Sequence, residues 1–95
     1  MVAKKGAKAM DLIETIKIYR VKNRLTQEEL GRKVGFSMAY INLIESGKNK
    51  PSFKFLSALA REGVITTNEA MEYASEIVKE RLENETVKAL LTAMK

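Results

Sequence analysis

The hydrophobic residues of the chain recur at steps of three and four, which is the spacing of one face of an α-helix. The first such run begins near Asp11 and extends to about Asn23. Further runs follow at about 26–34, 37–46, 52–61 and from 66 onward, where Glu83–Asn84–Glu85 interrupts the pattern. Nowhere do apolar and polar residues alternate in the period of two that marks a half-buried strand. The pattern predicts an all-α protein, with the last segment forming either one bent helix or two.

The boundaries of the second and third helices are marked by specific residues. Thr26 with Glu29 three positions later is a capping box, which begins a helix. Gly35 suits the left-handed turn that ends a helix, and Ser37 is placed to cap the next one. Two short helices joined by such a turn form a helix-turn-helix unit. Within the third helix, Tyr40, Ile41 and Ile44 form the ridge expected to face the core. The fourth helix is expected to bury these side chains: Phe53, Phe55 or Leu56, Leu59 and Ala60.

The net charge of +5 is unevenly distributed along the chain. Residues 1–65 contain 13 Lys and Arg against 6 Asp and Glu, whereas residues 66–95 contain 4 against 6. Residues 1–9 are rich in Lys, Ala and Gly and are expected to be flexible. A basic body favours a polyanionic partner such as nucleic acid, since phosphate contacts release counterions.

The residue types that are missing narrow the range of functions. The chain has no Cys and no His, so thiolate metal sites and histidine acid–base chemistry are excluded. Carboxylates, lysine and tyrosine remain as groups that an enzyme could use, but without histidine and cysteine we expect no enzyme, no catalytic residue, no metal and no cofactor. No apolar run reaches the roughly 18–20 residues that a membrane-spanning helix needs. The expectation is a soluble cytoplasmic protein without membrane contact.

The motif LTQEELGRKVGFSMAYINLIESGKNKPS, at 25–52, is the part of the chain that most closely follows a known family pattern. With its surroundings at 10–65 it resembles the Cro/phage-repressor type, or XRE-like, helix-turn-helix family. The resemblance covers roughly 55 of the 95 residues. It implies a compact bundle of about five helices whose third helix lies in the DNA major groove, with 66–95 as a C-terminal helical extension.

The resemblance also assigns roles to individual residues. It implies a charge pair between Arg20 and Glu45 at the end of the third helix. The positions that match base-facing residues are Ser37, Met38, Ala39, Asn42 and Leu43. Candidate phosphate contacts are Gln27, Arg32, Lys33, Lys48, Asn49, Lys50 and Lys54.

Three positions depart from the family pattern. Leu43 replaces a residue that is commonly Arg, Lys or Gln, Met38 replaces one that is often polar, and Gly31 replaces the usual Ala. Apolar side chains contact thymine methyl groups but make none of the bidentate bonds that read guanine or adenine. Specificity is then expected to lean on T-rich sites, backbone contacts and DNA shape.

The C-terminal segment predicts a second surface. A single recognition helix reads only a few base pairs, so such proteins usually bind as dimers at half-sites about 34 Å apart. The residues predicted to form a homodimer are Met71, Ala74, Val78, Leu82, Val87, Leu90 and Leu91. Alternatively, the first part of the segment, Ala70 to Ala74, only completes the core.

The sequence thus predicts a dimeric, sequence-specific regulator of transcription that binds double-stranded DNA, as a repressor or autoregulator. The rival interpretation is an antitoxin or adaptor, whose C-terminal helices or recognition helix bind a toxin or another regulator. A restriction–modification controller has a similar size and charge. The sequence does not separate these alternatives.

Overall fold

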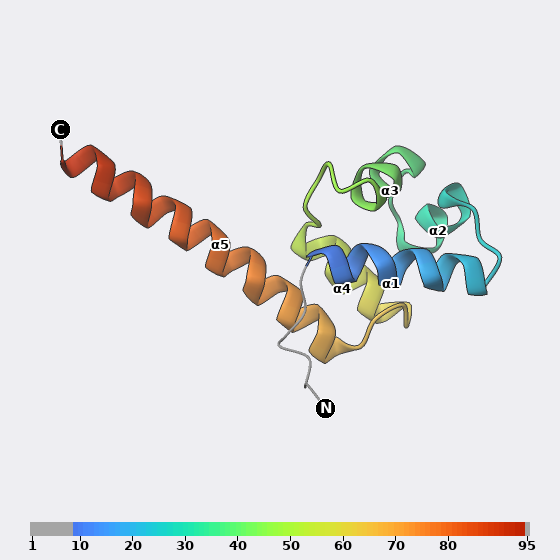
Figure 1. The fold of residues 1–95 in the computed structure, drawn as a ribbon. Coiled ribbons are helices and arrows are strands. Elements are labelled where there is room, and N and C mark those ends of the chain that lie inside the picture. Colours follow the sequence, from blue (N-terminus) through green and yellow to red (C-terminus); the bar gives the residue numbers. More distant parts are fainter. Residues whose placement is uncertain (1–8, 95) are drawn as a thin grey trace, which may run out of the picture.

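The computed structural model describes residues 9–94, which form five α-helices (Figure 1). These are α1 (Ala9–Lys22), α2 (Gln27–Val34), α3 (Met38–Glu45), α4 (Phe53–Arg61) and α5 (Thr67–Ala93). No strand occurs within this range, which confirms the predicted all-α fold with a helix-turn-helix and a C-terminal helix. Of the N-terminal segment expected to be flexible, 1–8 lie outside the described residues.

The core is built from the inner faces of α1 to α4, the loop between α4 and α5, and the first turns of α5. Its buried side chains are Leu12, Ile16, Leu30, Val34, Ile41, Ile44, Phe55, Leu56, Ala58, Leu59, Val64, Ile65 and Tyr73. Ile41 and Ile44 are buried as predicted, and Tyr40 is half-buried and packs against the core. The packing of these faces brings α3 against both α1 and α2.

The prediction that Phe53 lies in the core is wrong. Phe53 is 49% exposed, while Phe55 and Leu56 are buried. Phe53 opens α4 immediately after the capping Ser52. Each helical residue turns the side chain by about 100°, so Phe53 points about 200° away from Phe55. Phe53 consequently lies on the outside of the bundle, beside α5.

The N-termini of the last four helices are capped by hydroxyl side chains. Ser37 accepts a hydrogen bond from the Tyr40 N–H, and Ser52 accepts one from the Phe55 N–H. Thr26 forms the predicted capping box with Glu29. Because the Thr26 N–H donates a hydrogen bond to the Glu29 carboxylate, the pKa of Glu29 is held below its usual value. These bonds fix where each helix begins, and therefore the lengths of the turns between helices.

The C-terminal segment forms one continuous helix, α5, rather than two. Tyr73 is buried and Ala70, Ala74 and Ile77 pack against the core, so the first turns complete the bundle. Beyond Ile77 every described side chain is exposed, and the helix projects away from the body (Figure 1). Among the described residues, no helix combines the length and the apolar character required to cross a membrane.

Candidate nucleic-acid interface

The turn between α2 and α3 is held by backbone hydrogen bonds and depends on two glycines. The Gly31 carbonyl accepts hydrogen bonds from the N–H groups of Gly35 and Phe36, at 2.7 and 2.8 Å. Gly35 has φ +82°, the left-handed conformation that favours glycine. A Cβ added to Gly31 would lie only 2.4 Å from the Phe36 carbonyl oxygen. Glycine at 31 therefore allows the turn to pass directly over α2.

The outer face of α3 carries the five residues predicted to face bases. Ser37, Met38, Ala39 and Asn42 are exposed, and Leu43 is half-buried. Met38 leaves 54% of its area accessible to solvent. The structure therefore brings the five together on one surface, which combines a hydroxyl and an amide with apolar groups.

A chain of hydrogen bonds connects this surface to the interior. Arg20 binds Glu45 through two bonds, Nε to Oε2 at 2.8 Å and Nη2 to Oε1 at 3.0 Å. Gln27 donates from Nε2 to Glu45 Oε1 at 3.2 Å. Asn42 in turn donates from Nδ2 to Gln27 Oε1 at 3.4 Å. The chain thus links α1, α2 and α3 and ends at the exposed face of α3.

The buried member of this chain is Glu45, which is only 6% exposed. A buried carboxylate is costly unless it is paired and hydrogen-bonded, and Arg20 supplies both. Donation to Glu45 also raises the pKa of Arg20 above its ordinary value. The pairing of Arg20 with Glu45 was predicted from sequence, but the extension through Gln27 to Asn42 was not. No spacing rule links residues 15 or 18 positions apart, so only the tertiary structure could identify this extension.

Tyr40 connects α3 to the loop that follows it. Its ring lies 4.8 Å from that of Phe36 and 5.1 Å from that of Phe55. Its hydroxyl accepts a hydrogen bond from the Ser52 N–H at 3.0 Å. The sequence pattern predicted Tyr40 only as a core residue. Its position shows that it also fixes the end of the loop that carries Lys48, Asn49 and Lys50.

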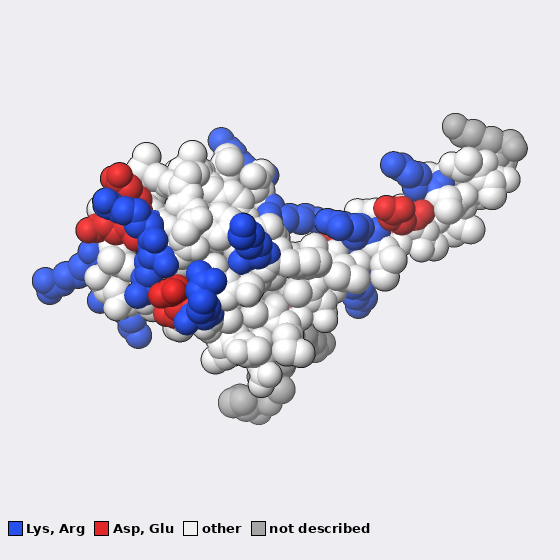
Figure 2. Space-filling view, turned by 180° about the vertical axis from the view of Figure 1, so that it is seen from behind, with Lys and Arg blue, Asp and Glu red and all other residues white. Residues whose placement is uncertain are grey.

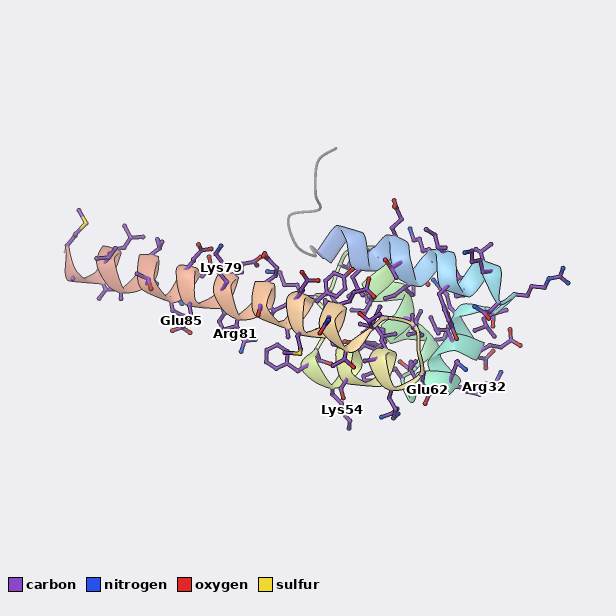
Figure 3. All side chains as sticks on the ribbon, turned by 90° about the horizontal axis from the view of Figure 1, so that it is seen from below. Arg32, Lys54, Glu62, Lys79, Arg81 and Glu85 are labelled. Carbon is purple, nitrogen blue, oxygen red and sulfur yellow. The ribbon has the colours of Figure 1, made fainter. Side chains whose placement is uncertain are left out.

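The predicted phosphate-binding residues are dispersed over the body, and two of the cations form ion pairs with carboxylates. Figure 2 shows Lys and Arg on several parts of the body rather than in one patch. Lys33 lies 4.0 Å from Glu62, the residue that follows the last turn of α4. Lys54 lies at the other end of the same helix, in the first turn of α4 (Figure 3). Lys50 forms an ion pair with Glu80 of α5. Lys48, Asn49, Lys54 and Arg32 are exposed, and Gln27 is half-buried.

Comparison with known proteins places this arrangement in a family. The model of the helix-turn-helix family matches residues 16–62. An HTH-type transcriptional regulator of Methanocaldococcus jannaschii is 44% identical over 46 residues, which are 48% of this chain and 70% of that protein. A regulator of the same description from Archaeoglobus fulgidus is 44% identical over 46 residues, 65% of its length. No solved structure gives a significant match.

The family match begins within α1 and ends just after α4, so it contains the turn, the exposed face of α3 and the hydrogen-bonded chain. The projecting part of α5 lies beyond it. The matched residues contain the two short helices and the glycine turn that the motif requires. The chain belongs to the Cro/phage-repressor type, or XRE-like, helix-turn-helix family.

Proposed function

We propose that this protein is a DNA-binding regulator of transcription that places α3 in the major groove and acts as a dimer in the cytoplasm. Its membership of the helix-turn-helix family and the description of two relatives as transcriptional regulators support this function. In this proposal, 10–65 are the DNA-binding domain and 66–95 bring two copies together. Two copies on a palindromic site upstream of the gene make the protein a repressor or autoregulator.

The observation that carries the proposal is the hydrogen-bonded chain that ends at Asn42. Asparagine recognises adenine by pairing its amide with N6 and N7. Because Nδ2 of Asn42 donates to Gln27, the amide is oriented before DNA arrives and loses less freedom on binding. Gln27 is half-buried between Asn42 and Glu45, and its second N–H is available to a phosphate. Asn42 thus reads a base while Gln27 holds the backbone beside it.

The remaining residues on the face make the site selective for thymine. Met38, Ala39 and Leu43 present apolar groups, which contact the methyl group of thymine but form no bond to guanine. Ser37 adds a hydroxyl at the N-terminus of α3, where the free N–H groups also favour a phosphate. The proposed half-site is rich in A and T, with Lys48, Asn49, Lys50 and Lys54 on flanking phosphates.

Asn42→Ala should weaken specific binding by about 1–3 kcal/mol and leave non-specific binding nearly unchanged, because one base contact is lost. Lys50→Ala is the matched comparison. It should weaken binding to every duplex and lower the slope of log affinity against log salt by about one. Fluorescence anisotropy with the upstream duplex and a scrambled duplex, at several salt concentrations, measures both. An equal loss on both duplexes for Asn42→Ala would remove it from the base-reading residues.

Glu80→Gln should tighten binding to all duplexes by about twofold to fivefold. Both side chains of the Lys50–Glu80 pair are more than half exposed, so the pair contributes at most about 1 kcal/mol. Its loss frees Lys50 for a phosphate. The gain should disappear when Glu80→Gln is combined with Lys50→Ala. Should the gain persist in the double variant, it would reflect only the change in net charge.

A protein-interaction module, acting as an antitoxin or adaptor, is the second candidate. The exposed apolar side chains of α5 support it, since a contiguous exposed apolar patch marks a surface that binds another protein. The salt titration separates the two functions. Phosphate-dominated binding falls steeply with salt, whereas a module that has lost DNA binding would show no affinity for any duplex even at low salt.

A further inference from the structure

The apolar residues on the projecting part of α5 form an inclined row rather than a straight stripe. Every fourth residue from Ala74 onward is apolar or threonine: Ala74, Val78, Leu82, Thr86, Leu90 and Met94. In contrast, the row two positions before it is polar throughout: Glu72, Glu76, Glu80, Asn84, Lys88 and Thr92. Rows of spacing four are inclined by about 26° to the helix axis and form the ridges that most often pack between helices.

A groove of about 990 Å³ runs beside this row. Its second wall is the neighbouring row, which consists of Met71, Ser75, Lys79, Glu83 and Val87, and the exposed Phe53 of α4 lines it as well. A ridge and an adjacent groove on the same helix are the two halves of ridge-into-groove packing. A second α5 would therefore offer the ridge that fits the groove and the groove that accepts the ridge.

The charges beside the row are arranged symmetrically about Leu82. Lys79 and Glu83 flank one side, and Arg81 and Glu85 flank the other; Figure 3 shows Lys79 projecting from the opposite side of α5 to Arg81 and Glu85. The two pairs are centred on residues 81 and 83. In an antiparallel pair that crosses at Leu82, each side of α5 faces the same side of the second copy. Lys79 then lies near Glu83 of the second copy, and Arg81 lies near its Glu85. A parallel copy would instead bring Lys79 near Arg81, and Glu83 near Glu85.

We propose that two copies of this chain pack through α5 as an antiparallel crossing pair centred on Leu82, each ridge seated in the groove of the other. Packing of two such rows gives an angle of about −50° between the helices. Both copies use the same patch, as a two-fold dimer requires. The proposal rests on the dimer of the proposed function and specifies its interface. Leu91 falls outside this interface, because nine residues make about two and a half turns of helix and place it on the opposite side from Leu82.

The first test compares Leu82→Glu with Leu91→Glu by sedimentation equilibrium of the full chain without DNA. The two leucines are 61% and 59% exposed in a single chain, so neither change should affect helix content, which circular dichroism checks. Leu82→Glu should raise the dimer Kd by at least about 100-fold, since it places charge at the buried centre. Leu91→Glu should change it by less than about threefold. Equal effects, or a wild-type chain that is monomeric at about 50 µM, would overturn the proposal.

The second test determines direction. Glu83→Lys should weaken an antiparallel dimer by about tenfold, because two attractive pairs become repulsive, and adding Lys79→Glu should restore it. In a parallel dimer Glu83→Lys would instead tighten association, since the introduced ammonium group would then face Glu85 of the second copy. That result would overturn the antiparallel arrangement.

DNA binding is measured separately from these dimer constants. With both proposals correct, Leu82→Glu binds a single half-site normally and loses affinity only for the two-half-site duplex. A wild-type chain that dimerises as described but binds no duplex would refute the proposed function alone. A chain that binds a half-site but remains monomeric would refute the interface alone.

Discussion

Replacing Glu45 by alanine should lower the free energy of unfolding by about 3 kcal/mol, one of the two largest effects expected in this protein. The carboxylate is 6% exposed and accepts three hydrogen bonds, two from Arg20 and one from Gln27. Without it, the guanidinium keeps, among the described residues, only the Leu25 carbonyl as a hydrogen-bond partner and stays largely buried. The cost falls at the lower end of the range for broken buried pairs, since the Arg20 side chain retains 22% exposure. Urea unfolding at neutral pH measures it.

The matched control removes both charges. Arg20→Met with Glu45→Leu replaces the pair by apolar side chains of similar length and should recover most of the lost stability, because no charge is left buried. DNA binding should not recover with it, since Gln27 loses the acceptor that positions Asn42. A double variant as unstable as Glu45→Ala would mean that the pair contributes through its own attraction. Full DNA affinity in the double variant would mean that Asn42 needs no positioning.

Gly31→Ala should also lower stability, by about 2 kcal/mol, although alanine is the better helix former. Helix propensity favours alanine by about 1 kcal/mol. Against this, the new Cβ would stand 2.4 Å from the Phe36 carbonyl oxygen, a backbone atom that moves only if the whole turn moves. Overpacking of this kind costs about 1–3 kcal/mol and here adds the loss of the two bonds that Gly31 accepts if the turn shifts. Thermal unfolding provides the measurement.

Gly35→Ala is the comparison that separates the effect of a steric clash from the effect of backbone conformation. A Cβ at Gly35 meets no atom within 4 Å, but its φ of +82° penalises any side chain by about 1–2 kcal/mol. That variant should lose stability without moving α3. Gly31→Ala should also weaken specific DNA binding, because the displaced turn carries Ser37 at the start of α3. If Gly31→Ala were more stable than the wild type, the close passage of the turn over α2 would not be a constraint.

Most of the fold follows from local rules that a sequence displays directly. Thr26 with Glu29, and Ser37 three residues before Tyr40, satisfy backbone groups within one turn of helix, so their spacing alone locates the helix starts. The same locality located the turn at Gly35. Phe53 was misplaced for a related reason: periodicity leaves the phase of a short helix open by a residue or two, and only packing against the rest of the bundle selects it.

The residues of the candidate site were identified by their likeness to a family, whereas the hydrogen bonds between them were found only in the tertiary structure. Arg20, Gln27, Asn42 and Glu45 come from three helices, and hydrogen bonds between them depend on how α1, α2 and α3 pack. The ion pair between Lys50 and Glu80 likewise joins a loop to a helix thirty positions away.

Sequence alone established the helices, their caps, the basic body and the helix-turn-helix motif, because each is written in neighbouring residues. Only the tertiary structure decided that 67–93 form one helix, that its first turns enter the core, and that Phe53 turns outward beside it. For the first turns of α5 and for Phe53 the physical reason is the same: residues distant in the sequence determine which side chains are buried, and their arrangement is settled when all the apolar faces pack together.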